Sequence, residues 1–431
     1  MIRIFRHVFR TVCFCFKLKS ISYEGKTLFL PASLSFFGCN VCFLLFICTK
    51  EGDIIEDSAF RSVDLRIIEK AEGTVMSLSD LVESYEVIKL ENRDEALIKT
   101  YPFGIFASDN YILLNPDAIS PIKLFTRKGQ YVADIGGIGQ GPGEYKTIHF
   151  CMIDEKQKRI YLGPGRANKI LTYDLKGNYL SDEAIHFKEI VHKPCIWMDH
   201  DKKHVTVVGL PFSENENSNF EISNNVCWVQ NREGDIVHRI SANHYGLIGD
   251  YSNGLVACRN VDAISFSIFE DPMLRTRPDT LYHYDAVKNI ITPRFTIDHV
   301  VSENQSACTV LYETSRSYWA RVTLYPNDIS SNSSPVRLTT FNVCVSKKDG
   351  SVKRIDRFTN DFLGLSYPFL TMRNGYVCIS YDPLELMDAL DKVLTQTDLK
   401  PEIRKRATGL RNSLHENDND ILMIGKLKSN Y

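Results

Sequence analysis

The sequence predicts an all-β protein, a six-bladed β-propeller with a short C-terminal helical insertion in its last blade. One observation is a recurring unit in which a β-rich run, a polar turn and a second β-rich run follow one another. Another is that each such unit is preceded by a further pair of strand-like runs. A repeated unit of four strands and this length is typical of a propeller blade, and the span 79–431 holds about six of them.

The repeated hairpins share one turn position, which is glycine in four units and asparagine in one. These positions recur at intervals of about 48 to 61 residues, a period typical of propeller blades. Glycine and asparagine tolerate the positive φ that a tight turn requires, so we expect a positive φ at each of them. The positions are Gly129, Gly177, Gly234, Asn289 and Gly350.

The two ends of the chain are predicted to complete one blade together. The segments "FLTMRNGYVCISYD" and "DILMIGKLK" supply strands near the C-terminus, and "SYEVIKLEN" supplies the remaining strand from the N-terminal part. This pairing would close the ring and remove an exposed sheet edge. Between the C-terminal strands, residues 383–417 carry apolar side chains at helical spacing, which predicts one or two amphipathic helices.

The segment 1–48 is predicted to direct export or anchor the chain, and residues 49–78 to form a linker. Basic residues precede an apolar stretch from Leu28 to Cys48, the charge order of an export signal. In "NVCFLLFICTKEGD" the chain resembles a bacterial lipoprotein, whose signal is cut before a cysteine that becomes lipidated. Cys48 is the predicted lipidation site, and Cys39 or an uncleaved membrane anchor are the alternatives. The true start codon stays open at this point.

The composition excludes some classes of partner. With 44% apolar and 24% charged residues, the 431-residue chain can bury a large core. A net charge of -2 provides no basic excess, so nucleic acid is not predicted as a partner. No second cysteine pair completes a zinc site, and scattered cysteines such as Cys227 are interpreted as small buried hydrophobes. No metal or cofactor is predicted.

The glycine-rich run "GGIGQGPGEYKTI" does not fit a phosphate-binding loop. A dinucleotide fingerprint would place glycine at position 142, and a P-loop would place lysine directly after its last glycine. A strand pattern follows the run, so no helix N-terminus faces it. We therefore predict a loop that turns the chain, with structural residues Gly139, Gly141, Pro142, Gly143, Glu144 and Tyr145.

The stretch from Tyr111 to Leu180, with its "GQGPGEY" loop, resembles an NHL-type repeat. Together with the lipoprotein-like start, the chain is similar to the 6-bladed β-propeller lipoproteins of Bacteroides-type bacteria. The resemblance implies that the loop links neighbouring blades, that Tyr145 packs between them, and that the protein is lipid-anchored at the outer membrane or cell surface. Where many NHL repeats carry an aspartate, this chain reads "GPGRANKI", so no role of that aspartate carries over.

Catalytic or metal chemistry has weak support in the sequence. The cluster "DHDKKH", from Asp199 to His204, is interpreted as the polar tip of a hairpin, and histidines such as His192 as structural residues. No metalloprotease, nucleophile-elbow or EF-hand motif is present. Aromatic rings can bind sugars, although they also pack blades together. The candidate ligand face comprises Trp197, Trp319 and Tyr367. Further aromatic candidates are Tyr101, Phe103, Tyr111, Tyr245, Tyr251, Tyr325 and Phe369.

These observations predict a surface-exposed lipoprotein of the cell envelope whose propeller is a non-catalytic binding or scaffold module for glycan or protein. A propeller hydrolase or lyase acting on extracellular polysaccharide or peptide is the alternative. An accessory subunit that docks through its helices is a third. Because one fold hosts many functions, the ligand, any catalysis and the oligomeric state stay open at this point.

Overall fold

The protein is described by a computed structural model in which the chain divides into two compact units, Met1–Glu51 and Gly52–Tyr431. Side chains are described for residues 60–98, 102–117, 120–199, 203–213, 220–271, 277–298, 306–325 and 338–429. In the first unit, β1 (Ser20–Tyr23) and β2 (Lys26–Phe29) form an antiparallel pair. The predicted lipidation site, Cys48, lies outside the described residues.

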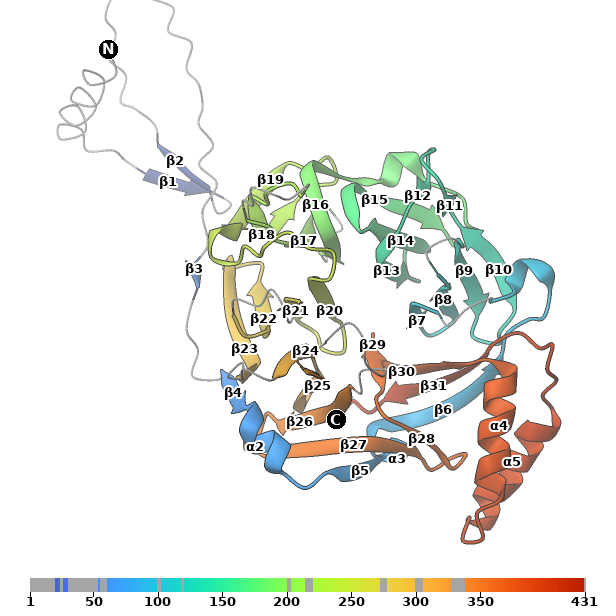
Figure 1. The fold of residues 1–431 in the computed structure, drawn as a ribbon. Coiled ribbons are helices and arrows are strands. Elements are labelled where there is room, and N and C mark those ends of the chain that lie inside the picture. The colour runs from blue at the N-terminus through green and yellow to red at the C-terminus, as the bar shows by residue number, and fades with distance from the viewer. Residues whose placement is uncertain are drawn as a thin grey trace, which may run out of the picture. The chain divides into compact units, whose positions relative to one another are not determined.

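The second unit is mostly β, and its sheets have a propeller-like arrangement (Figure 1). The described residues form five sheets of four to seven strands, together with small two-stranded ones. The first is an antiparallel meander of β7 (Gly104–Ala107), β8 (Tyr111–Asn115), β9 (Ile122–Thr126) and β10 (Tyr131–Ile135). The second contains β13 (Ile148–Asp154), β14 (Arg159–Pro164), β15 (Arg166–Asp174), β16 (Ile185–Met198), β17 (Val205–Leu210), β18 (Asn225–Gln230) and β19 (Ile236–Ser241).

Two further sheets continue the ring. One contains β20 (Gly254–Cys258), β21 (Ile264–Phe269), β22 (Thr280–Asp285) and β23 (Ile290–Asp298). The other contains β24 (Gln305–Glu313), β25 (Ser317–Pro326), β26 (Thr339–Ser346), β27 (Val352–Asn360) and β28 (Leu365–Tyr367). The described sheets number five and not six, because β16 runs without a break through the seven-stranded sheet. The sheet count alone therefore does not confirm the predicted number of blades.

Part of the predicted linker 49–78 has regular structure and lines the outside of these two sheets. Strands β3 (Asp53–Ile54) and β4 (Arg61–Asp64) pair in parallel with β23, and β5 (Thr74–Ser77) pairs in parallel with β27. A short helix, α2 (Leu65–Lys70), connects β4 to β5, and a second, α3 (Leu78–Leu81), follows β5. The segment adds outer strands to edges that would otherwise leave backbone hydrogen-bonding groups unpaired.

The last sheet joins the two ends of the unit. It contains β29 (Thr371–Arg373), β30 (Tyr376–Tyr381), β31 (Ile421–Leu427) and β6 (Val82–Lys89). Strand β31 pairs antiparallel with β6, from Ile421 opposite Lys89 to Leu427 opposite Val82. The predicted pairing of the N-terminal and C-terminal segments is therefore confirmed.

Two helices, α4 (Pro383–Leu394) and α5 (Pro401–Asn412), lie between β30 and β31 at the outer side of the ring (Figure 1). The Asp382 side chain caps α4 by accepting hydrogen bonds from the Leu384 and Glu385 amides, and proline follows it at the first helical position. The apolar face of α4 is buried through Leu386, Leu390 and Val393. This helix pair therefore packs on the core of the closing sheet through one face only.

All five predicted turn residues have a positive φ, between 58° at Asn289 and 92° at Gly234. At Gly129, where φ is 82°, a side chain would also meet its neighbours, because an added Cβ would lie 2.2 Å from the carbonyl oxygen of Lys89. Glycine is therefore required there both by the turn and by the close approach of β6.

A buried carboxyl group at the start of β31 makes the closing sheet sensitive to pH. Asp420 is only 7% exposed and accepts a hydrogen bond from Ser380 Oγ at 2.7 Å. Burial, together with the negative charges of Asp382 and Glu385, raises the pKa of Asp420 to about 6. Compared with the unfolded chain, the folded protein therefore binds a proton at Asp420 more tightly.

We expect Asp420→Asn to stabilise the protein above pH 6. Because the folded pKa exceeds the unfolded value of about 3.9, the stability from this group is complete below about pH 4 and is lost as the pH rises through 6. Two pKa units correspond to roughly 2–3 kcal/mol, so urea unfolding at pH 7.5 should show a gain of about that size and none at pH 4. The control is Asp418→Asn, since the pKa of Asp418 is lowered and the ion pair with Lys89 would be lost. An equal gain for Asp420→Asn at both pH values would contradict the prediction.

Candidate functional site

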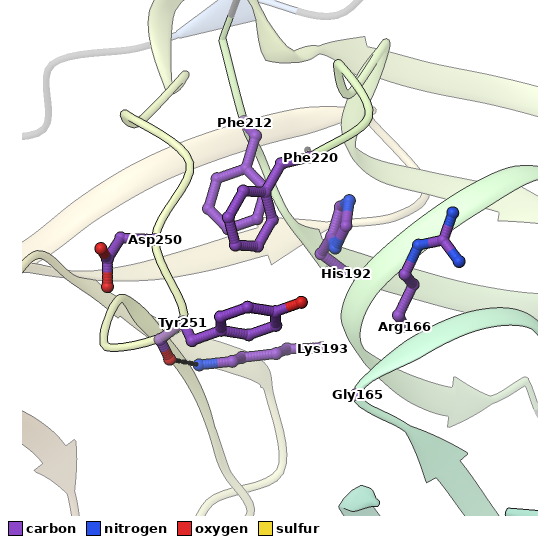
Figure 2. A pocket seen from close by; sticks show the side chains of 8 residues that line it. All are labelled: Gly165, Arg166, His192, Lys193, Phe212, Phe220, Asp250 and Tyr251. Atoms are coloured by element: carbon purple, nitrogen blue, oxygen red, sulfur yellow. Dashed lines mark hydrogen bonds between the residues drawn. The ribbon is translucent and has the colours of Figure 1, made fainter. Parts of the chain in front are cut away.

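A cavity of about 230 Å³ lies among connections of neighbouring sheets (Figure 2). It is built from the β14–β15 turn, the middle of β16, the two ends of the connection between β17 and β18, and the connection between β19 and β20. No two of these segments are adjacent in sequence. The lining residues are Gly165, Arg166, His192, Lys193, Phe212, Phe220, Asp250 and Tyr251.

Aromatic rings form one wall of the cavity. The Tyr251 ring is 80% exposed, and its centre lies 4.7 Å from that of Phe220. Phe220 lies 4.9 Å from the buried Phe212, which in turn lies 4.8 Å from His192. Figure 2 shows the Tyr251 ring at the end of this series, alongside the Lys193 side chain. The wall thus continues the core outward and ends on an exposed aromatic face.

Lys193 fixes the position of Tyr251. Its ammonium group donates hydrogen bonds to the carbonyl oxygen of Tyr251 at 2.8 Å and to that of Asn253. Burial lowers the pKa of Lys193, although the charge of Asp250 acts in the opposite direction. The φ of Lys193 is 45°, a value uncommon for a residue with a side chain, so the surrounding contacts hold the backbone in a strained form.

The charges around the cavity are balanced. Arg166 forms an ion pair with Glu221, and Lys193 lies within reach of the charge of Asp250. Hydrogen bonds from Ser252 lower the pKa of Asp250, so this carboxylate is ionised at neutral pH. Two cations thus face two anions, and the site favours a neutral polar ligand over a strongly charged one.

His192 does not have the setting of a general base. It is 4% exposed, and its Nε2 lies 3.3 Å from Glu221 Oε2 without the geometry of a hydrogen bond. Burial, with the charges of Arg166 and Lys193, lowers the pKa of His192 to about 4, so the ring is neutral at pH 7. Within the described part of the chain, no three His, Cys, Asp or Glu side chains are grouped as metal ligands would be.

None of the three predicted ligand-face residues lines the cavity, and Trp319 and Tyr367 lie together in the apolar cluster of the closing sheet. Trp319 is fully buried, with its ring stacked 6.2 Å from Tyr312, and Tyr367 is 6% exposed, with its hydroxyl accepting a hydrogen bond from Asn360 Nδ2. For these two the prediction of a ligand face is corrected, because a buried ring offers no face to a ligand. Trp197 is half-buried beneath the Arg259 guanidinium group.

The glycine-rich loop turns the chain between β10 and β13. The short strands β11 (Gly137–Ile138) and β12 (Glu144–Tyr145) pair in parallel with each other, and Gly143 has a φ of 75°. The Glu144 carboxylate accepts a hydrogen bond from the Gly141 amide at 2.7 Å, so an acidic side chain occupies the place where a phosphate would bind. The loop residues Gly139 and Pro142 belong to the same turn.

Tyr145 connects this loop to the core. It is 4% exposed and packs in the apolar cluster that the first sheet shares with β13, β14 and β15. Its hydroxyl donates to the Ile135 carbonyl oxygen and accepts from the Ile122 amide, both at 2.8 Å. The ring thus lies between two adjacent sheets and holds the edge of the first one.

The structure also shows the surroundings of the other residues considered in the sequence analysis, the Asp199–His204 cluster and the cysteines. Asp199 and His204 lie at the base of the β16–β17 hairpin, where the Asp199 amide donates to the His204 carbonyl oxygen, and His200 and Asp201 lie outside the described residues. The described cysteines are free, and all but Cys308 are buried. Burial raises the pKa of Cys151 and Cys195 to about 12, so these thiols are protonated and unreactive. The interpretation of the scattered cysteines as buried hydrophobes is confirmed.

Residues 62–426 match the family described as "Domain of unknown function (DUF4934)". The chain belongs to the DUF4934 family. No match exists among curated proteins. Within the described residues, none of the helices has both the length and the apolar character needed to cross a membrane.

One solved structure shares the fold of this DUF4934 chain, and a second is reported for comparison. A Bacteroides fragilis protein, assigned by its name to the exported proteins, is 15% identical, with 85% of this chain and 99% of that chain covered and a TM-score of 0.55. A DUF4221 family member from Bacteroides vulgatus is 11% identical, with 81% and 97% covered and a TM-score of 0.44.

Sequence reasoning named Tyr251 only as one of ten aromatic candidates and His192 only as a structural histidine, and it missed the other residues that line the cavity of this DUF4934 protein. Arg166 at the start of β15, Lys193 within β16 and Asp250 in the β19–β20 connection belong to no motif and lie far apart in the sequence. One available signal was the polar run "GDYSNG" before β20, because a tyrosine in a polar connection is more exposed than one in a strand.

Proposed function

We propose that this DUF4934 protein is a non-catalytic, glycan-binding module of the cell envelope, and that its ligand binds in the cavity of Figure 2. The observation that carries the proposal is Tyr251, an aromatic ring that is 80% exposed at the mouth of a cavity. Sugar rings stack on exposed aromatic rings through their apolar faces, and the cavity beside Tyr251 supplies polar groups for the hydroxyl groups of such a ligand.

The polar groups around Tyr251 suit the hydroxyl groups of a neutral sugar. Arg166 and Lys193 can donate hydrogen bonds, and Asp250 can accept them. Because the cavity, at about 230 Å³, is smaller than the pockets that enclose drug-sized ligands, it suits one sugar unit, with the rest of the glycan on the surface. A buried neutral His192 without a partner nucleophile gives less support to the alternative, a hydrolase or lyase.

We also propose that the sheets represent six blades. Support comes from β16, whose 14 residues exceed the other strands in length. Its start pairs with β15, for example Ile185 opposite Ile170, and its end pairs with β17, as in Trp197 opposite Thr206. Division of the seven-stranded sheet at β16 yields two blades of four strands each. The assignment to the NHL type rests on the sequence resemblance of Tyr111 to Leu180.

Export and anchoring complete the proposal. We propose that Cys48 is lipidated and that the folded unit faces the outside of the cell at the outer membrane or cell surface. The basic residues and apolar stretch before Cys48 support export, as does the name of the Bacteroides fragilis protein that shares the fold.

We expect Tyr251→Ala to weaken glycan binding by about ten-fold or more, since loss of one stacked ring removes roughly 1–2 kcal/mol. The unfolding temperature should not change, because the ring is exposed. The measurement is a glycan array followed by calorimetry with the best ligand. The control is Phe103→Ala, whose ring is 70% exposed but does not line the cavity. Equal affinity for Tyr251→Ala and the unaltered protein would refute the site, and release of reducing ends from the bound glycan would establish the hydrolase or lyase alternative.

A further inference from the structure

A second cavity, of about 320 Å³, lies where the innermost strands of four sheets end. Strands β7, β20, β24 and β29 are the members of their sheets nearest the centre of the ring (Figure 1). The segment that follows each of them contributes to the wall of this cavity, and the end of β31 completes the wall. The wall includes Asp109 after β7, Asn260 after β20, Ser315 after β24, Asn374 after β29 and Lys428 after β31.

This second cavity is separate from the cavity around Tyr251. Asp250 and Tyr251 precede β20, whereas Asn260 follows it, so the two cavities lie at opposite ends of the same strand. Among the described residues, none lines both cavities. A ligand in the second cavity would therefore be held by side chains that take no part in the proposed glycan site.

The Asn260 side chain holds together the segments around the second cavity. Its Nδ2 donates hydrogen bonds to the carbonyl oxygens of Glu313 and Met372, both at 3.1 Å, and its Oδ1 accepts one from the Gly375 amide at 3.0 Å. The connection after β20 is thereby tied to the end of β24 and to the β29–β30 turn. Because one side chain fixes three segments, the wall is organised before any ligand binds.

A buried hydroxyl group orients the carboxylate of Asp109. Tyr376 is only 7% exposed, and its hydroxyl donates a hydrogen bond to Asp109 Oδ1 at 2.9 Å. Burial and the neighbouring carboxylate raise the pKa of Tyr376 to about 12, so the hydroxyl keeps its proton and remains a donor. Asp109 itself is exposed, and its second oxygen can accept hydrogen bonds from a ligand.

The segment after β31 brings a lysine to the same cavity. The Lys428 amide donates a hydrogen bond to the Leu81 carbonyl oxygen at 3.0 Å, and Ser315 Oγ donates one to the Ser429 carbonyl oxygen at 3.1 Å. These bonds hold the segment against α3 and against the β24–β25 turn. Lys428 is half-buried, so its ammonium group is carried by a backbone in a fixed position.

The charged residues that line the second cavity differ in whether they have a partner. Lys426 forms an ion pair with Glu83 at 3.5 Å. Within the part of the chain that the structure describes, neither Asp109 nor Lys428 forms an ion pair. A ligand with both an ammonium group and a carboxylate would complement these two charges, whereas a simple anion or cation would be attracted by one and repelled by the other.

We propose that the second cavity binds a small zwitterion, a free amino acid or a short peptide with free ends, whose ammonium group contacts Asp109 and whose carboxylate contacts Lys428. At about 320 Å³, the cavity lies at the lower end of the range for ligand pockets, which suits a short ligand of this kind. The proposal does not depend on the proposed glycan function, because the two ligands occupy different cavities.

The test is titration calorimetry of the full chain in nonionic detergent, with alanine, dialanine and trialanine as probes. We expect saturable binding of at least one of them, and the tightest binder shows the length that the cavity accepts. That probe is then compared with its N-acetyl form, which lacks the ammonium group, and with its amide, which lacks the carboxylate. Each of these two capped forms should bind about ten-fold or more weakly than the free probe.

Two variants assign the ends of the ligand to the two charges. Lys428→Met should bind the free probe about ten-fold or more weakly but should bind the amide as the unaltered protein does, because the amide has no carboxylate to lose a partner. Asp109→Asn should show the same pattern with the N-acetyl form, and its side-chain oxygen can still accept from Tyr376. Lys405→Met, at an exposed position of α5 outside the cavity, is the matched control and should keep the full affinity.

Four results would overturn the proposal. One is the absence of saturable binding with all three probes. Another is equal affinity for the free probe and its two capped forms. The third is that Lys428→Met and Asp109→Asn leave the affinity unchanged or weaken the free and capped forms alike, as a change in cavity shape would. The fourth is a loss of binding in Tyr251→Ala, which would place the probe in the other cavity.

Discussion

A chain that ends at Asn419 is expected to lose its cooperative unfolding transition. The truncation removes β31, which lies between β30 and β6 and is buried along nearly its whole length. Without β31, the N-terminal strand β6 has no partner in its sheet, and the ring opens at the only place where its two ends pair within the described residues. Because a folded protein is stable by only about 5–15 kcal/mol, the loss of this closure should exceed the total.

The matched control is a chain that ends at Ser429, which keeps β31 and should unfold like the full chain. A graded variant, Leu422→Ala, removes a fully buried side chain opposite Ile88 and should cost about 2–5 kcal/mol. Calorimetry or thermal unfolding followed by circular dichroism measures both. A sharp transition near the full-length temperature in the chain ending at Asn419 would show that ring closure is not what holds the fold together.

Glu313→Gln is expected to lower the free energy of unfolding by about 3–5 kcal/mol. Glu313 is fully buried at the end of β24. One carboxylate oxygen lies 2.5 Å from His283 Nε2 and accepts a hydrogen bond from Ser265 Oγ, and the other lies 2.5 Å from Lys347 Nζ. An amide has only one acceptor oxygen, so it cannot accept from the donors on both sides, and it cannot balance the charge of Lys347. A partly buried cation would therefore remain without its counter-charge.

The same network of Glu313, His283 and Lys347 makes the stability of the folded protein depend on pH in the acidic range. Burial alone would raise the pKa of Glu313, but His283 and Lys347 outweigh it and lower the pKa to about 2. Since the folded value lies below the unfolded one of about 4.3, the stabilisation is present above that pH and is lost as the pH falls toward 2. Glu313→Gln should therefore flatten the stability profile between about pH 4 and 2.

Urea unfolding at several pH values measures this effect. Glu183→Gln is the matched control, because its ion pair with Arg159 is about a third exposed and should contribute at most about 1 kcal/mol. The double variant Glu313→Gln with Lys347→Met should recover part of the loss, since it removes the unpaired cation. A loss for Glu313→Gln no greater than that for Glu183→Gln would show that the network does not stabilise the fold.

Much of the local structure could be predicted from the sequence because its causes are local. The turn residues, from Gly129 to Gly350, were identifiable because a tight turn needs a positive φ, which few residues tolerate. The apolar spacing after Pro383 predicted helices, and α4 and α5 lie within the expected interval. The phosphate-loop reading of Gly139 to Gly143 could be rejected because the flanking pattern indicated a strand, and β13 follows.

The sequence by itself thus determined the β-rich repeat and its turns, because the conformation of a turn depends on the residues within it. It also determined the pairing of β6 with β31, because a ring of repeats leaves an unpaired sheet edge unless its first and last strands pair. Only the tertiary structure decided which aromatic rings are buried. Trp319 and Tyr251 were both aromatic candidates for a ligand site, yet Trp319 lies in the core and Tyr251 is exposed to solvent. It likewise decided that a presumed linker adds strands to two sheets, and that distant connections form one cavity. The physical reason is that burial and convergence depend on how neighbouring sheets pack, and no short stretch of sequence contains that information.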